Sequence, residues 1–213
     1  MGQAPIRILL VDDHVVVRNG VRLMLGSEAD MAVVAEASNA QEALQAVKGG
    51  QYDVALVDIA MQGMNGLDLL RHLRTEAPKM EVLMLSTYAE DVYAVRAFKL
   101  GAAGYLTKDT PAATLIAAVR KAAAGGKYLS PALAERIAEL LGGGEAATHE
   151  ALSNRELEVM KMIAAGESLT KIAGTLHLSP NTVTTYRARI FQKLGVTSNA
   201  ELTRYAIENG LLV

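Results

Sequence analysis

Short apolar runs alternate with longer amphipathic segments through the first 126 residues of the chain. An apolar run bounded by turn residues is typical of a strand buried on both faces of a parallel sheet, and apolar positions at helical spacing are typical of a covering helix. Their alternation predicts an α/β fold built on a doubly wound, flavodoxin-like parallel sheet. The five predicted strands are Ile6–Val11, Met31–Ala37, Val54–Asp58, Glu81–Ser86 and Gly104–Thr107.

A helix is expected after each strand. Asn39 is typical of a helix N-cap, and Pro111 is expected at the first-turn position of the last helix. The predicted helices run from Val15 to Leu25, from the Asn39 cap to about Lys48, from Gly66 to about Thr75, from about Glu90 to Leu100, and onward from Pro111.

The rest of the chain predicts helices only. A short amphipathic helix at Pro131–Leu141 and the glycines Gly142–Gly144 make residues 127–150 the expected linker. In residues 151–213, Ser153 and Glu156 form a capping box that begins a helix. The helices expected there end at Gly166, span Ser168–Leu176, run from the cap at Ser179-Pro180 to Gly195, and run from Asn199 to about Glu208. Two of them joined by a short turn predict a small all-α helix-turn-helix domain.

Composition narrows the class of protein. The 213 residues are 51% hydrophobic and contain no cysteine, and no apolar stretch reaches the length of a membrane span. We therefore expect a soluble cytoplasmic protein without disulfides, thiolate metal sites or a membrane partner. Residues 1–126 carry 12 Lys and Arg against 14 Asp and Glu, whereas residues 151–213 carry 7 against 5 and no aspartate. This asymmetry predicts two domains with different partners.

Polar side chains gather where the predicted strands end. Asp12 and Asp13 follow the first strand, Asp58 ends the third, Ser86 ends the fourth and Lys108 follows the fifth. With strand order 2-1-3-4-5, the first and third strands are neighbours, so three carboxylates converge at the ligand-binding edge. Carboxylates so close to one another repel unless a cation lies between them, and Mg²⁺ is a cation that prefers oxygen ligands. Together with the lysine and the hydroxyl, they predict phosphoryl transfer onto Asp58.

Two alternatives accompany this interpretation. Asp58 alone could be a capping aspartate for the helix that begins near Gly66, but the other polar residues at the same edge favour the phosphoryl-transfer site. His14 follows the acidic pair and could be a metal ligand, although the sequence favours a loop histidine at the start of the first helix.

Residues 5–125 resemble the receiver domain of two-component response regulators through Asp12-Asp13, Asp58, Ser86, Tyr105 and Lys108. The resemblance implies a role for each residue. Asp58 would be the phosphoacceptor, Asp13, Asp58 and the Ala60 carbonyl would bind Mg²⁺ directly, Asp12 would bind it through water, Ser86 and Lys108 would contact the phosphoryl group, and Tyr105 would be the switch aromatic. Gln62 and Asn65 depart from the usual family residues, which are proline and, in many members, aspartate.

A helical wheel over residues 180–194 separates two faces. The predicted buried stripe is Val183, Tyr186, Ile190 and Leu194. The opposite face is small and polar, as a helix entering the major groove requires, although an ordinary solvated face is the alternative. Asn181, Thr185, Ala188 and Gln192 face outward with Thr184 and Arg189 on the flanks, and Arg187, Arg189 and Lys193 are the predicted phosphate contacts.

Residues 150–213 resemble the LuxR-type DNA-binding domain through Leu152–Val159, Ile172-Ala173, Leu178–Val183 and Lys193–Val196. The whole chain is thus similar to a NarL/FixJ-type response regulator. The resemblance implies a sensor histidine kinase, double-stranded DNA and a second copy of the chain as partners, and leaves a contact with RNA polymerase open. Thr184, Tyr186 and Lys171 depart from residues frequent in the family. Because Thr184 and Ala188 are uncharged, we expect few base contacts.

The leading hypothesis is a transcription factor in which phosphorylation of Asp58 shifts domain arrangement and dimerisation. It would not be an enzyme acting on other substrates. A phosphohydrolase is the second hypothesis, but haloacid-dehalogenase-type enzymes need a general-acid aspartate two residues after the nucleophile, where this chain has Ala60. A third keeps the DNA-binding module and makes the first domain a purely structural dimerisation unit.

Overall fold

The computed structural model describes residues 4–61, 63–87, 90–141 and 148–212. Gln62 and the predicted glycine linker, residues 142–144, lie outside these ranges. The chain divides into two compact units, Met1–Ala138 and Glu139–Val213, and the division falls within the segment predicted as a linker. Each unit is described by itself below.

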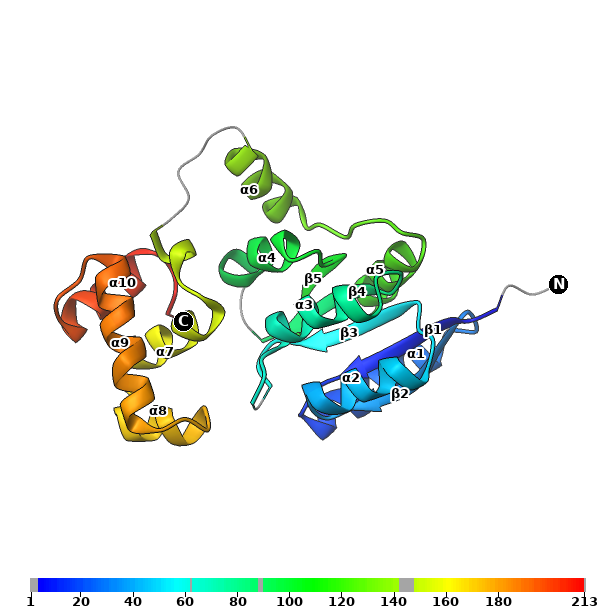
Figure 1. Ribbon diagram of the computed structural model, residues 1–213. Helices are drawn as coiled ribbons and strands as arrows, with labels where there is room; N and C mark the ends of the chain where they lie inside the picture. The colour runs from blue at the N-terminus through cyan, green and yellow to red at the C-terminus, as the bar shows by residue number, and fades with distance from the viewer. Residues whose placement is uncertain (1–3, 62, 88–89, 142–147, 213) are drawn as a thin grey trace. The chain divides into compact units, whose positions relative to one another are not determined.

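The first unit is built on a five-stranded, all-parallel sheet (Figure 1). The strand order β2-β1-β3-β4-β5 is the predicted one. Val11 of β1 lies in register with Val57 of β3, so the residues that follow each, Asp12 and Asp58, leave the same edge side by side. The strands are β1 Ile6–Val11, β2 Met31–Ala37, β3 Val54–Asp58, β4 Glu81–Ser86 and β5 Gly104–Thr107.

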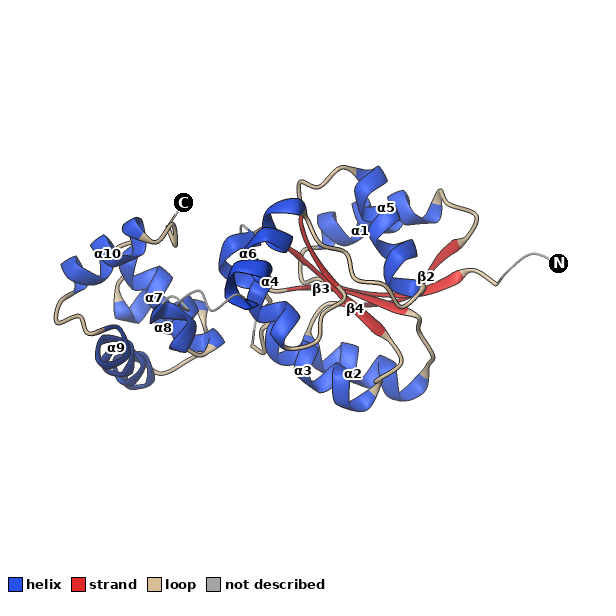
Figure 2. Ribbon diagram, turned by 90° about the horizontal axis from the view of Figure 1, so that it is seen from above, coloured by secondary structure: helices blue, strands red, loops and turns tan. Residues whose placement is uncertain are grey.

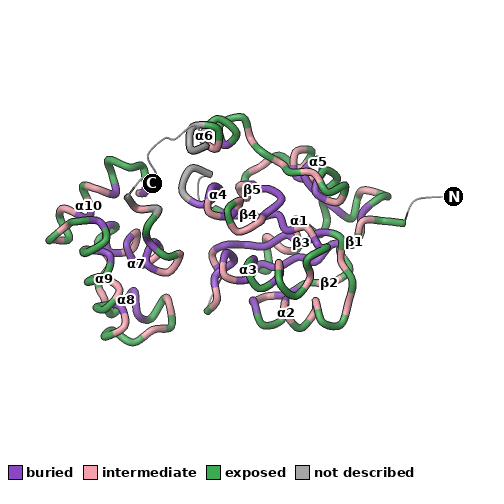
Figure 3. Tube along the Cα trace, turned by 45° about the horizontal axis from the view of Figure 1, so that its top comes forward, coloured by how far each residue is buried: buried purple, intermediate pink, exposed green. Residues whose placement is uncertain are grey.

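Helices cover both faces of the sheet (Figure 2). One face carries α1 (Val15–Gly26) and α5 (Ala112–Ala123). The other carries α2 (Ala40–Gly49), α3 (Gly66–Glu76) and α4 (Glu90–Lys99). Every residue of the central strand β3 is buried because helices lie on both sides of it, whereas in the edge strand β2 only the end residues Met31 and Ala37 are buried (Figure 3). The continuous apolar run of β3 is the sequence pattern expected of a strand with helices on both of its faces.

The chain after β3 is packed tightly against the strand that precedes it. Asn65 is the N-cap of α3, and its side-chain oxygen accepts a hydrogen bond from the Asp68 amide at 3.0 Å. The capping alternative for Asp58 is therefore wrong. A Cβ atom at Gly66 would lie 2.0 Å from the Asp58 carbonyl oxygen, so only glycine permits this approach. A smaller correction concerns Pro111, which is the N-cap of α5 and not its first helical residue.

The second unit is helical. The turn between α8 (Leu169–Thr175) and α9 (Pro180–Leu194) includes His177 with φ of 52°, and these two helices form the predicted helix-turn-helix. They pack on α7 (Asn154–Ala164), which begins at the predicted capping box with both reciprocal hydrogen bonds present. The fourth helix is α10 (Asn199–Glu208), and α6 (Pro131–Leu141) contains the division between the units. The buried side chains include Leu157, Met160, Ile163, Ile172, Val183, Ile190 and Leu202.

One element of the second unit has no counterpart in the sequence prediction. A 3₁₀ helix, η1 (Thr148–Ala151), precedes α7. The His149 amide donates to the Tyr205 hydroxyl of α10 at 3.0 Å, which ties this short element to the bundle. Among the described residues, no helix is both long and apolar enough to cross a bilayer.

Candidate functional site

Acidic side chains meet at the carboxyl edge of the sheet. Asp12, Asp13, His14 and Asp58 each offer one potential ligand atom, and these atoms all lie within 4.8 Å of one another. Asp12 and Asp58 are each 1% exposed, and Asp13 is partly exposed. Strand order brings them together, as the sequence predicts, because β1 and β3 are neighbours and both end at this edge.

Lys108 neutralises part of this charge. Its Nζ lies 2.7 Å from Asp12 Oδ2 and 2.7 Å from Asp58 Oδ2, and its side chain is 10% exposed. Burial raises the pKa of Asp58, and the Asp12 charge raises it further, while the hydrogen bond and charge of Lys108 oppose the shift. Burial disfavours the ammonium, but hydrogen bonds to the two carboxylates outweigh it and raise the pKa of Lys108. One ammonium thus serves two buried carboxylates.

Backbone groups complete the frame around the acceptor. The Ala60 amide donates to Asp58 Oδ1 at 3.1 Å, and the Lys108 amide donates to the Ser86 carbonyl at 2.8 Å. Ser86 is fully buried at the end of β4 and pairs in register with Thr107 of β5. The ring of Tyr105, two residues earlier on β5, is also fully buried. Its predicted movement as a switch stays a prediction.

Two residues beside the acidic pair add to what the sequence suggested. His14 is the N-cap residue of α1, as expected for a loop histidine, and its Nδ1 also lies 2.7 Å from Asp13 Oδ1. Arg18, one turn into α1, donates from its guanidinium to the Asp12 carbonyl and lies 3.5 Å from Glu36. Sequence reasoning missed Arg18, although its spacing of four from His14 put it on the same helical face.

The donor set fits a hard divalent cation. Three carboxylates lie together and Lys108 pairs with only two of them, so the edge keeps an excess of negative charge, and carboxylate oxygens are the ligands that Mg²⁺ prefers. Asp12, Asp13 and Asp58 are the residues that could hold it.

The second candidate site is the outward face of α9. Asn181, Thr184, Thr185, Ala188, Arg189 and Gln192 are all exposed, and Val183, Ile190 and Leu194 are buried. Tyr186, predicted in the buried stripe, is only partly buried. The hydroxyls of Thr184 and Thr185 donate back to the Pro180 and Asn181 carbonyls, both at 3.0 Å. The predicted small, polar surface is therefore present.

The three predicted phosphate contacts differ in their surroundings. Arg187 donates to Asn199 Oδ1 at 3.0 Å and stacks 4.8 Å from the Phe191 ring centroid. Lys193 donates to the buried Glu156 at 2.6 Å, so its ammonium is less available to a phosphate than the sequence suggests. Arg189 is exposed and has no hydrogen bond or ion pair within the described part of the chain.

Glu156 ties α9 to the start of α7. Its carboxylate accepts from the Ser153 amide at 2.7 Å as well as from Lys193. Burial opposes ionisation, but the hydrogen bonds from Lys193 and Ser153 lower the pKa of Glu156 below its ordinary value. Lys193 therefore positions the helix that carries the candidate DNA contacts.

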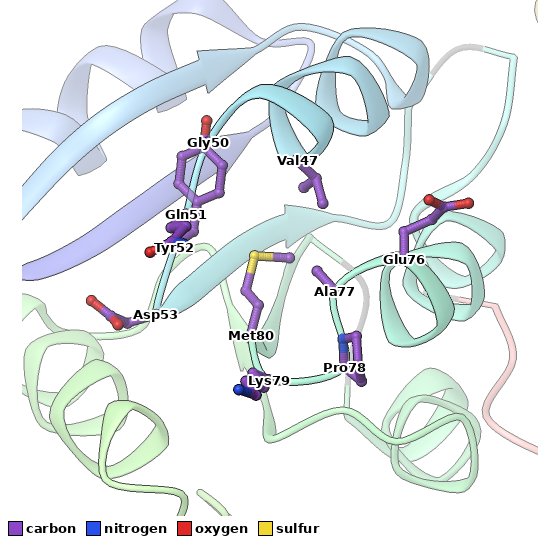
Figure 4. A pocket seen from close by; sticks show the side chains of 10 residues that line it. All are labelled: Val47, Gly50, Gln51, Tyr52, Asp53, Glu76, Ala77, Pro78, Lys79 and Met80. Atoms are coloured by element: carbon purple, nitrogen blue, oxygen red, sulfur yellow. The ribbon is translucent and has the colours of Figure 1, made fainter.

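A separate cavity of about 500 Å³ lies at the opposite edge of the sheet (Figure 4). Tyr52 and Asp53 line it just before β3 begins, and Met80 lines it just before β4. Since Asp58 and Ser86 end these same strands, the cavity takes no part in the acidic site.

Comparison with known proteins finds a match for each of the two domains. Residues 8–120 match the response regulator receiver domain, and residues 150–206 match the bacterial regulatory proteins of the luxR family. The response regulator GacA of Pseudomonas aeruginosa is 36% identical over 211 residues, which cover 97% of this chain and 98% of the relative.

Solved structures show the same organisation. The response regulator ChrA of a haem-sensing two-component system is 36% identical, with a TM-score of 0.54 over 98% of this chain and 100% of that one. RcsB of Salmonella enterica serovar Typhimurium shares the fold at 23% identity, with a TM-score of 0.64 over 94% of this chain and 98% of that one. With both domains matched and their elements in place, the chain belongs to the NarL/FixJ-type response regulators, which join a receiver domain to a LuxR-type DNA-binding domain.

Proposed function

We propose that this protein is a transcription factor switched by phosphoryl transfer onto Asp58. The observation that carries the proposal is the placement of one ammonium, Lys108 Nζ, at 2.7 Å from both Asp12 and Asp58 on a buried edge. A buried carboxylate held beside a cation, with excess negative charge around it, suits a nucleophile that acquires a charged phosphoryl group.

The donor would be a phosphohistidine on a sensor kinase. A carboxylate oxygen of Asp58 attacks phosphorus, a P–O bond forms, the P–N bond breaks, and the imidazole leaves with the electron pair and takes a proton from water. Mg²⁺ held by Asp12, Asp13 and Asp58 would neutralise charge on the transferred group. The Ala60 amide orients the acceptor carboxylate, and Lys108 and Ser86 are the proposed contacts of the phosphoryl oxygens. The Ala60 carbonyl is the proposed remaining ligand.

The phosphoryl group is transferred to the protein's own Asp58, so we do not assign the protein an activity on other substrates. A phosphohydrolase needs an acid for the leaving group, and Ala60 supplies none. A purely structural receiver would not need Lys108 and two carboxylates buried together, because burying charged groups costs free energy of folding.

The proposed output is DNA binding through α9. Asn181, Thr184, Thr185, Ala188 and Gln192 would face the groove, and Arg187, Arg189 and Lys193 would lie nearest the phosphates. RcsB, which shares the fold, has been solved bound to the promoter rprA in the presence of the phosphomimetic BeF₃⁻. We expect a homodimer on activation and a cytoplasmic location.

Asp58 and α9 lie in different compact units, so the phosphoryl group must act by shifting a population between domain arrangements. A tenfold change in DNA affinity requires about 1.4 kcal/mol. If the unphosphorylated receiver occludes the output domain, a chain of residues 145–213 will bind DNA more tightly than the unphosphorylated full chain in a titration by fluorescence anisotropy. Equal binding would instead favour activation by pairing two output domains.

Intact-protein mass spectrometry after incubation with a small-molecule phosphodonor tests the acceptor. We expect a Mg²⁺-dependent phosphoryl adduct in the wild type and in the control Asp53→Asn, whose exposed carboxylate lies at the other end of β3. Asp58→Asn should show no adduct while its circular dichroism stays native. An adduct of wild-type yield in Asp58→Asn would refute the assignment.

A further inference from the structure

We propose that His14 Nδ1 is a fourth ligand of the acidic site, so that this side chain strengthens binding of imidazole-preferring divalent cations such as Ni²⁺ and Zn²⁺ more than it strengthens binding of Mg²⁺. The inference rests on the cation site of the proposed function and adds a nitrogen donor to its oxygens. It concerns which metals the site accepts, and it does not alter the assignment of Asp58 as acceptor.

The distances around His14 are those of ligands that share one ion. Nδ1 lies 2.7 Å from Asp13 Oδ1, 3.3 Å from Asp12 Oδ1 and 4.0 Å from Asp58 Oδ2. With metal–ligand bonds of about 2.1 Å, adjacent octahedral ligands lie about 3.0 Å apart and opposite ones about 4.2 Å. The first two separations match adjacent positions and the third matches opposite positions, so a single ion can satisfy all of them.

The local backbone explains why the ring reaches the cluster. His14 is the N-cap of α1, and its amide donates to Asp12 Oδ1 at 2.8 Å, which folds the turn over the first carboxylate. The side chain is 62% exposed, so burial in the core does not dictate its position. Its polar contacts within the described chain are to the three carboxylates. The ring is therefore placed by the acidic group itself.

A simpler role for His14 is a hydrogen bond from Nδ1–H to Asp13. That role and the ligand role give the same separation but different consequences. A ligand must carry its ring proton on Nε2 and leave the Nδ1 lone pair for the metal. Imidazole nitrogen suits Ni²⁺ and Zn²⁺, whereas Mg²⁺ prefers oxygen, so only the ligand role makes the effect of His14 depend on the metal.

Calorimetric titration of the full chain, prepared without a histidine tag, separates the two roles. MgCl₂ and NiCl₂ are each titrated into the wild type, His14→Gln and the control His72→Ala, which removes an exposed histidine on α3 that is outside the cluster. We expect His14→Gln to lose at least about tenfold in Ni²⁺ affinity, with Mg²⁺ affinity changed by less than about twofold. His72→Ala should match the wild type for both metals.

Three results decide between the possibilities. Unchanged Ni²⁺ affinity in His14→Gln would overturn the proposal, and so would an equal loss for both metals, because His14 would then act on any cation. Loss of Ni²⁺ affinity in His72→Ala as large as that in His14→Gln would also overturn it. The proposed function has a separate test: a phosphoryl adduct that persists in Asp58→Asn would refute it, independently of the Ni²⁺ affinities.

Discussion

Replacing Asp58 with asparagine should make the receiver domain more stable at neutral pH in the absence of divalent cations. The side chain is buried, and its pKa is raised by that burial, so its ionisation opposes folding. Asparagine keeps nearly the same shape and removes the charge. The substitution leaves Lys108 paired with Asp12 at 2.7 Å, so no buried cation is orphaned.

The geometry indicates which electrostatic effect dominates. At an effective dielectric constant of about 20, attraction between Asp58 and Lys108 at 2.7 Å is worth about 6 kcal/mol. Repulsion from Asp12 and Asp13, each within 4.8 Å, comes to at least about 3.5 kcal/mol apiece. Repulsion offsets part of the attraction to Lys108, and the cost of burying the charge is the largest effect on Asp58. We therefore expect a gain of about 1–3 kcal/mol, or about 2–4 °C in the melting temperature for each kcal/mol.

The assay is urea and thermal unfolding with EDTA at several pH values. A carboxyl whose folded pKa is raised destabilises the fold above that pKa, and the penalty disappears as the pH falls toward the ordinary carboxyl range. The advantage of Asp58→Asn should thus be largest near pH 7 and shrink in acid, while the exposed control Asp53→Asn shows no gain. A destabilised Asp58→Asn at pH 7, or an advantage independent of pH, would refute the reasoning.

Three further predictions concern contacts around the two sites. Arg18→Ala should weaken Mg²⁺ binding by about tenfold in a calorimetric titration with the fold intact, because the backbone that carries Asp12 loses the guanidinium that holds it in place; an unchanged or increased affinity would show that Arg18 does not position the site. Arg189→Ala should weaken binding to all DNA sequences and reduce the salt slope by about one; a loss confined to one operator position would make Arg189 a base reader. Lys193→Met should destabilise the second unit by about 1–3 kcal/mol because Glu156 stays buried with fewer donors. Because the folded state lowers the pKa of Glu156, the stability that the Lys193–Glu156 pair contributes is fully present at pH values above the ordinary glutamate pKa and is lost as the pH falls through the folded pKa. A destabilisation by Lys193→Met that does not change with pH would contradict the ion pair.

The sequence predicts the sheet well because helices cover both faces of its central strands. A strand buried on both faces shows an unbroken apolar run, and the ends of β3 and β4 coincide with the predicted ones. The strand order 2-1-3-4-5 is a common order of doubly wound sheets, and the structure has it; this order brings Asp12 to Asp58. The acidic site could therefore be predicted from topology before any side chain was placed.

Contacts that depend on tertiary packing could not be predicted in this way. A wheel shows which face of α9 is outward, but it cannot show that Lys193 reaches Glu156, 37 residues earlier in the chain. The 3₁₀ helix η1 was missed because a four-residue element has no periodicity to detect, and His149 is fixed by the distant Tyr205. Arg18 escaped notice because its acceptor is a backbone carbonyl, which has no signature in sequence.

The close approach of Gly66 to the Asp58 carbonyl has a consequence for how the gene can vary. A library of all substitutions at position 66 should yield almost no folded receivers, because even the smallest side chain would place its first carbon 2.0 Å from a backbone oxygen. This intolerance would look like selection for signalling in a screen of activity, although the glycine supplies no atom to the phosphoryl group. The geometry of one strand-to-helix turn therefore prevents substitution at position 66. The same constraint would hold in a descendant of this protein that had lost its kinase.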